Sequence, residues 1–193
     1  MKSNVTTGKG DSGQTRALDG TQFEKCHPMM EALGTLDTLR THTALLRLQL
    51  QEKYPEETRQ IKFLLFLLHT YFLIGTTISD PQMRKPEWHR GEITTKHLQR
   101  LESEQQHLEE DLTLPHSFIV SATNPIAAQA DITASTARAF ERRFVAFCQS
   151  TPEFQHPTCL AYINRISDYF FILARQLEKG LHQPVDYSTL EHD

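Results

Sequence analysis

The chain has 193 residues, of which 38% are hydrophobic, so it suits one domain with a buried core. Its net charge of -4 and isoelectric point near 6.2 provide no general basic field, so a nucleic-acid partner is not expected. Three widely spaced cysteines form no CxxC pair, which argues against a zinc site and a disulfide framework. We therefore expect a reducing compartment, by default the cytoplasm. No membrane contact is expected, because the N-terminus lacks an apolar signal segment and the most apolar run, residues 63–74, is shorter than a bilayer span.

The chain begins with a polar arm that contains the sequence VTTGKGDSGQT at residues 5–15. Its composition is typical of a mobile tail. The GDSG at 10–13 also matches the nucleophile loop of chymotrypsin-like proteases, but the chain lacks the β-barrel context that such a serine needs. A phosphate-binding loop is the third interpretation, because glycines let backbone N–H groups converge on an anion while Thr and Lys add donors and charge.

Apolar spacing predicts five helices after the arm. They cover residues 30–52, 57–79, 93–112, 124–147 and 158–179. The second is apolar almost all round and is expected to be the most buried, central helix, and residues 80–92 should form a surface loop. Asn124 followed by proline predicts the start of the fourth helix, and Gly180 is a candidate C-terminal cap of the fifth. The predicted fold class is an all-α, five-helix bundle.

Two polar clusters interrupt the predicted helices. Arg138, Glu141 and Arg142 share one face of the fourth helix, where they could form a solvated salt-bridge face or a ligand site. On the fifth helix Asn164, Ser167 and Asp168 lie together at helical spacing, where they could make contacts between helices or bind a ligand. Neither cluster alone decides between these alternatives.

Taken together, the arm and the two clusters resemble the corrinoid adenosyltransferases of the propanediol-utilisation type. Gly10, Asp11 and Gly13 match that family's T-x-T-G-D-x-G-x-[ST] signature, and YINRISD at 162–168 is similar to its [YF]-L-N-R-L-S-D. The resembling segments are, in chain order, residues 7–15, 25–37, 118–120, 138–142 and 162–168.

The resemblance implies a five-helix bundle, usually a trimer, that binds ATP between neighbouring subunits and makes adenosylcobalamin. It implies an ATP-binding arm at 1–28, a helical adenosyltransferase domain at 29–182 and a C-terminal tail at 183–193. The ATP-binding residues it implies are Thr7, Gly8, Lys9, Gly10, Thr15, Arg16, Lys25, Arg138, Glu141, Arg142 and Asn164. The substrates would be ATP and cobalamin, with Mg²⁺ held by the ATP phosphates and no metal ligand from the protein. An adenosylcobalamin-dependent enzyme or a flavoprotein reductase would be a further partner.

The resemblance also implies a corrinoid side formed by Phe118, Asp37 and Asp168, with Phe118 and Arg138 assigned to catalysis. In the family a phenylalanine beneath the corrin displaces the lower cobalt ligand; without the resemblance, Phe118 would be interpreted as a core aromatic. Co(I) then attacks the ribose 5′ carbon of ATP, and charge that develops on the leaving triphosphate is stabilised by cations and N–H groups.

Several positions depart from the family pattern. The Pro-Gly-Gly turn is Ser-Ala-Thr at 121–123, the histidine of the fourth helix is Asp131, and the arginine that pairs with the equivalent of Asp37 is Ala134. Thr38 and Ala139 replace a glutamate and an arginine. These departures leave two alternatives to an active adenosyltransferase: a catalytically weak relative that binds ATP or corrinoid as a carrier, sensor or accessory subunit, and a helical interaction protein with a disordered arm.

Overall fold

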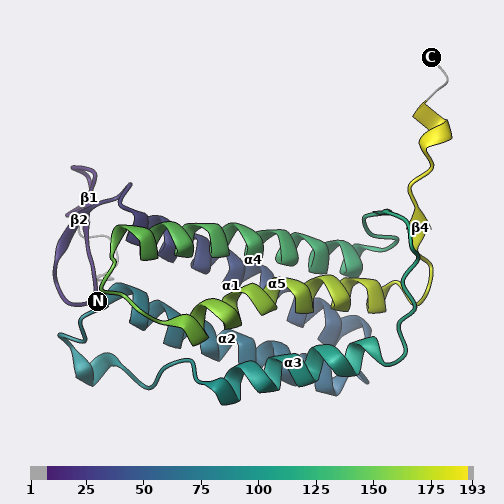
Figure 1. Ribbon diagram of the computed structural model, residues 1–193, viewed down its shortest axis with the longest axis horizontal. Helices are drawn as coiled ribbons and strands as arrows, with labels where there is room; N and C mark the ends of the chain where they lie inside the picture. The colour runs from purple at the N-terminus through teal and green to yellow at the C-terminus, as the bar shows by residue number, and fades with distance from the viewer. Residues whose placement is uncertain (1–7, 191–193) are drawn as a thin grey trace.

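The computed structural model describes residues 8–190 and contains a bundle of five α-helices (Figure 1). The helices are α1 (Pro28–Lys53), α2 (Thr58–Ser79), α3 (Thr95–Glu109), α4 (Pro125–Ser150) and α5 (Pro157–Leu177). The predicted all-α fold class is confirmed. The segment between α2 and α3 is a loop with one short 3-10 turn, Pro86–Trp88, as expected for residues 80–92.

The helix ends follow from local capping. Asn124 accepts hydrogen bonds from the N–H groups of Ile126 and Ala127 at 3.1 and 3.0 Å, which confirms the predicted start of α4. The C-terminal end of α5 is Leu177, two residues earlier than predicted, and Glu178 is the C-cap of this helix. Gly180, with a φ of 78°, lies in the turn that follows rather than at the cap itself.

The centre of the bundle is α5, not α2. Twelve of the 21 residues of α5 are buried, compared with nine of the 22 in α2, so the expectation that the second helix is the most buried is wrong. The outer face of α2 carries Phe72, which is 57% exposed and lies beneath the Arg40 guanidinium. Of the described helices only α2 is long and apolar enough to cross a membrane, and its inner face packs in the bundle.

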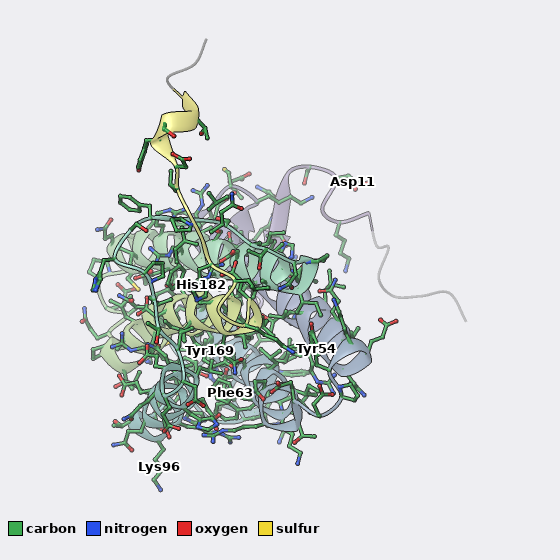
Figure 2. The ribbon with its side chains drawn as sticks, turned by 90° about the vertical axis from the view of Figure 1, so that its right-hand side faces the viewer. Asp11, Tyr54, Phe63, Lys96, Tyr169 and His182 are labelled. Atoms are coloured by element: carbon green, nitrogen blue, oxygen red, sulfur yellow. The ribbon has the colours of Figure 1, made fainter. Side chains whose placement is uncertain are left out.

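Aromatic side chains fill the space between the helices. Figure 2 looks along the bundle and shows Phe63 of α2 and Tyr169 of α5 between the helices; their ring centroids are 4.9 Å apart. Two buried tyrosine hydroxyls have threonine partners: Tyr71 meets Thr43 at 3.3 Å, and Tyr162 meets Thr70 at 3.0 Å. These pairs satisfy polar atoms that would otherwise be costly to bury.

Two small antiparallel strand pairs lie at opposite ends of the bundle (Figure 1). In the arm, β1 (Gln14–Arg16) pairs with β2 (Gln22–Glu24), so this part of the arm is a hairpin, which was not predicted. At the other end β3 (Ile119–Val120) pairs with β4 (Gln183–Pro184). A final 3-10 turn, Tyr187–Leu190, extends away from the bundle.

Candidate functional site

The glycine-rich part of the arm forms consecutive tight turns. The N–H of Asp11 donates to the Gly8 carbonyl at 3.3 Å, and that of Gly13 donates to the Gly10 carbonyl at 3.2 Å. Gly8 and Gly13 have φ values of 67° and 84°, a region that favours glycine. The N–H of Lys25 donates to the Gly13 carbonyl at 2.9 Å, which joins the loop to the segment that enters α1.

Lys25 lies against this loop. A Cβ built on Gly10 would come within 3.2 Å of the Lys25 ammonium nitrogen, so the position accommodates a glycine with the lysine packed over it. Gly10 and Lys25, which were predicted to bind ATP from separate segments of the sequence, therefore lie in contact. A lysine ammonium packed on a glycine-rich loop is a suitable arrangement for binding phosphate oxygens.

A cavity of about 520 Å³ lies on this part of the arm. Its lining residues are Lys9, Gly10, Gln14, Thr15, Arg16 and Gln22, four of which were predicted to bind ATP. The lining combines two cations with a hydroxyl and carboxamide groups, and it contains no carboxylate. This combination favours an anionic ligand. The predicted site residue Thr7 lies outside the described residues.

The helix residues predicted to bind ATP are not among those that line the arm cavity. Arg138 and Arg142 are exposed on α4 and Glu141 is half-buried, while Asn164 is exposed on α5. Within residues 8–190, neither Arg138 nor Arg142 has an ion-pair partner, so these two arginines do not form the solvated salt-bridge face that was the alternative interpretation. Their guanidinium groups are available to a ligand.

Phe118 is not a core aromatic, because its side chain is 78% exposed. It borders a cavity of about 430 Å³ between the loop before α4 and the faces of α4 and α5. Arg138 and Ala134 also line this cavity, so the structure brings together the two residues predicted to be catalytic. Phe171 provides a further apolar wall.

A buried charge cluster that the sequence reasoning missed lies beside the Phe118 cavity. Arg175 is 2% exposed, and its guanidinium lies 2.5 Å from an Asp131 carboxylate oxygen and 3.5 Å from one of Glu178. Burial raises the pKa of Asp131, and the charge and hydrogen bond of Arg175 partly oppose this effect. An arginine in the otherwise apolar run YFFILAR of α5 was the signal that could have indicated the cluster.

Asp37 and Asp168, predicted on the corrinoid side, do not line the Phe118 cavity. Asp37 is exposed on α1 and pairs with Arg40 at 2.9 Å, so it has a counter-ion in its own helix although position 134 is alanine. It shares a different cavity, of about 580 Å³, with Arg16 of the arm. Asp168 pairs with Arg165 at 3.0 Å.

The arm cavity lies on the β1–β2 hairpin and the Phe118 cavity beside β3. These strands lie toward opposite ends of one bundle (Figure 1). The described residues contain no cluster of three or more His, Cys, Asp or Glu side chains suited to a metal ion. The structure defines a helical bundle with an arm cavity whose lining favours an anion and a separate, partly apolar cavity bordered by an exposed phenylalanine.

Comparison with known proteins places this bundle in a family. The family model for cobalamin adenosyltransferase matches residues 5–177, and the chain belongs to the cobalamin adenosyltransferase family. It is 32% identical to the corrinoid adenosyltransferase of Bacillus subtilis, with 88% of this chain and 83% of that protein covered. It is 28% identical to the corrinoid adenosyltransferase PduO of Citrobacter freundii, where 93% of this chain spans only 51% of the relative. The chain therefore spans about half the length of that relative.

A solved structure has the same fold. It is a variant of the PduO-type ATP:corrinoid adenosyltransferase from Lactobacillus reuteri, with a phenylalanine replaced by alanine, complexed with cobalamin and ATP. The TM-score is 0.79 at 22% identity, with 95% of this chain and 98% of that chain covered. At this identity the comparison establishes the fold.

Proposed function

We propose that this protein is an ATP-dependent corrinoid adenosyltransferase. It transfers the 5′-deoxyadenosyl group of ATP to the cobalt of cob(I)alamin or cob(I)yrinic acid diamide and releases triphosphate. The observation that carries the proposal is the arm, where Lys9, Gly10, Thr15 and Arg16 line one cavity and Lys25 packs on Gly10. Family membership and the named activities of the relatives support the same reaction.

The residue types of the two cavities suit the two halves of this reaction. The arm offers N–H, hydroxyl and cationic groups to the triphosphate, which leaves with increasing negative charge when Co(I) attacks the ribose 5′ carbon. Mg²⁺ would be carried by the phosphates. The exposed ring of Phe118 is suited to contact the lower face of a flat corrinoid, where it would exclude an axial ligand from cobalt and so make Co(II) easier to reduce.

We further propose that the complete site forms between copies of the chain in a homotrimer. The separation of the arm from the Phe118 cavity within one chain supports this arrangement (Figure 1). A neighbouring copy would bring its arm to the α4 and α5 face that carries Arg138, Arg142 and Asn164. Binding of ATP would order this arm over the nucleotide, where the arm would act as a lid.

The proposed setting is the cytoplasm, supported by three free cysteines among the described residues. A flavoprotein reductase would supply Co(I), or an adenosylcobalamin-dependent enzyme would receive the product. Both partners follow from the chemistry of the reaction rather than from a particular surface of this chain.

A second candidate is a relative that binds ATP or corrinoid with weak catalysis. It is favoured by Asp131 and Ala134, which replace a histidine and an arginine of the family pattern at the Phe118 cavity. The two candidates share ATP binding and differ in turnover, so they are separated by measuring both quantities in the same preparation.

ATP binding tests the assignment of the arm and the helix face. We expect Lys25→Ala and Asn164→Ala to weaken Mg-ATP binding in calorimetry by about tenfold each, equivalent to about 1.4 kcal/mol. Lys96→Ala is the matched control, because Lys96 is an exposed lysine on α3, away from either cavity (Figure 2). Unchanged affinity in both Lys25→Ala and Asn164→Ala would refute the assigned nucleotide site.

Turnover tests the assignment of Phe118. Phe118→Ala should lower the rate of adenosylcorrinoid formation far more than it lowers ATP affinity, because the side chain faces the corrinoid cavity and not the arm. Leu181→Ala, another largely exposed apolar side chain, is the control for nonspecific surface effects. Normal turnover of Phe118→Ala would show that this ring is not the wedge.

A further inference from the structure

The position of Phe118 raises a physical question. A large apolar side chain that is 78% exposed gains little from packing, and it lies in a segment that has only a two-residue strand. Such a segment would be expected to sample several positions unless other parts of the chain hold its backbone. Two independent contacts from the C-terminal part of the chain do so.

The first contact is made by the segment that includes β4. The N–H of Val185 donates to the Phe118 carbonyl at 2.8 Å, and the adjacent pairs join Ile119 with Pro184 and Val120 with Gln183. Pro184 has no N–H, so it cannot donate to β3. The hydrogen bond from the Val185 N–H is therefore the one that fixes the backbone of Phe118 itself.

The second contact holds the other side of the same loop. Glu178 is 1% exposed, and one of its carboxylate oxygens accepts a hydrogen bond from the Thr123 N–H at 3.1 Å. Its other oxygen lies 2.7 Å from Nδ1 of His182, the residue that leads into β4. One buried carboxylate thus ties the loop before α4 to the start of the C-terminal segment; Figure 2 shows His182 over the end of the bundle.

Between these two contacts the backbone is strained. Ala122 has a φ of 58°, which disfavours a residue with a side chain. A conformation of this kind persists only when the surrounding structure determines it. The contacts at Phe118 and Thr123 lie on either side of Ala122 and hold its backbone in this conformation.

We propose that Glu178 and residues 182–185 form a clamp that positions Phe118 over its cavity, with Glu178 and the Val185 N–H as positioning groups for the corrinoid half-reaction. The inference rests on the proposed function. The clamp fixes the position and direction of the Phe118 ring. Loss of the clamp would therefore reduce displacement of the lower cobalt ligand. None of the residues assigned to ATP binding belongs to the clamp, so ATP affinity should not depend on it.

The test uses the full chain and compares Val185→Pro with Val185→Ala. Val185→Pro removes the N–H, whereas Val185→Ala keeps it and removes only side-chain atoms. We expect Val185→Pro to lower kcat at least tenfold while leaving the KM for ATP and the melting temperature unchanged, and Val185→Ala to behave like the wild type. Glu178→Ala should lower kcat likewise, and Glu178→Gln, which keeps an acceptor for the Thr123 N–H, should restore part of it.

A spectroscopic readout separates positioning from general damage. In the electron paramagnetic resonance spectrum of Co(II) cobalamin bound with Mg-ATP, nitrogen splitting from the lower ligand disappears when that ligand leaves. Val185→Pro should retain this splitting where the wild type loses it. Equal kcat and equal spectra in Val185→Pro and Val185→Ala would overturn the clamp. Absence of turnover in the wild type would instead overturn the proposed function, so the two failures are distinguishable.

Discussion

Asp80 is predicted to stabilise the loop that follows α2. It caps that helix, is 1% exposed, and accepts hydrogen bonds from the N–H groups of Arg84 and Lys85, both at 2.8 Å. Its carboxylate also lies 3.0 Å from Nε2 of His89. Asp80→Ala removes all three interactions at once and leaves their donors to be satisfied by water.

The size of the effect follows from these bonds. Hydrogen bonds to a charged group contribute about 1.5–3 kcal/mol each, and the lost donors lie in an exposed loop where water replaces part of the loss. We therefore expect Asp80→Ala to lower the free energy of unfolding by about 3 kcal/mol. For a chain of this size the melting temperature should fall by roughly 6–12 °C.

Thermal and urea unfolding, followed by circular dichroism, measure this change. Asp186→Ala is the control, because Asp186 makes similar local bonds to Ser188 but is fully exposed in the C-terminal segment; its variant should melt like the wild type. If Asp80→Ala melted at the same temperature as Asp186→Ala, the inference that Asp80 organises the loop would be wrong.

The pH dependence provides a second check. Burial alone would raise the pKa of Asp80, but bonds from the Lys85 and Arg84 backbone and from His89 outweigh it and lower the pKa below its ordinary value of 3.8. A depressed folded-state pKa stabilises the protein above pH 3.8, and this contribution is lost as the pH falls through the folded pKa. The difference between wild type and Asp80→Ala should therefore shrink below about pH 4.

Three further predictions concern the core, the thiols and the arm. Phe144→Ala should lower the free energy of unfolding by about 3–5 kcal/mol in urea titrations, because the ring is fully buried; a loss below 1 kcal/mol would contradict this packing. A thiol reagent should modify exposed Cys26 first and Cys159 of the folded protein last, since burial raises the pKa of Cys159 to about 12. Mass spectrometry of the modified peptides measures this order, and modification of Cys159 before Cys26 would contradict it. Arg84→Ala should speed proteolysis of the arm, because Arg84 bonds to Asp19 at 3.3 Å; an unchanged cleavage rate would show that this contact does not hold the arm.

The sequence was most informative where local chemistry determines the structure. The cap at Asn124 and the apolar spacing of α4 predicted that helix correctly, because both signals act within a few residues of the chain. The relative burial of α2 and α5 was not predictable in the same way. Both helices are strongly apolar, and only the packing of the whole bundle decides that Phe72 faces outward.

Part of the candidate site was likewise visible in advance. The glycine-rich arm indicated an anion site, and the structure adds the approach of Lys25 to Gly10. The pairing of β4 with β3 and the contacts of Glu178 were not predictable, because they join segments about 60 residues apart through two-residue strands and single side chains. No periodicity in the sequence marks such contacts.

The most direct test of the proposed function is the visible absorption spectrum of the purified protein with Mg-ATP and anaerobically reduced cobalamin, followed over time. The account predicts conversion to light-sensitive adenosylcobalamin at a rate that depends on the protein. No conversion under conditions in which the Bacillus subtilis relative is active would contradict it; if Mg-ATP still bound, the weakly catalytic relative would become the better description.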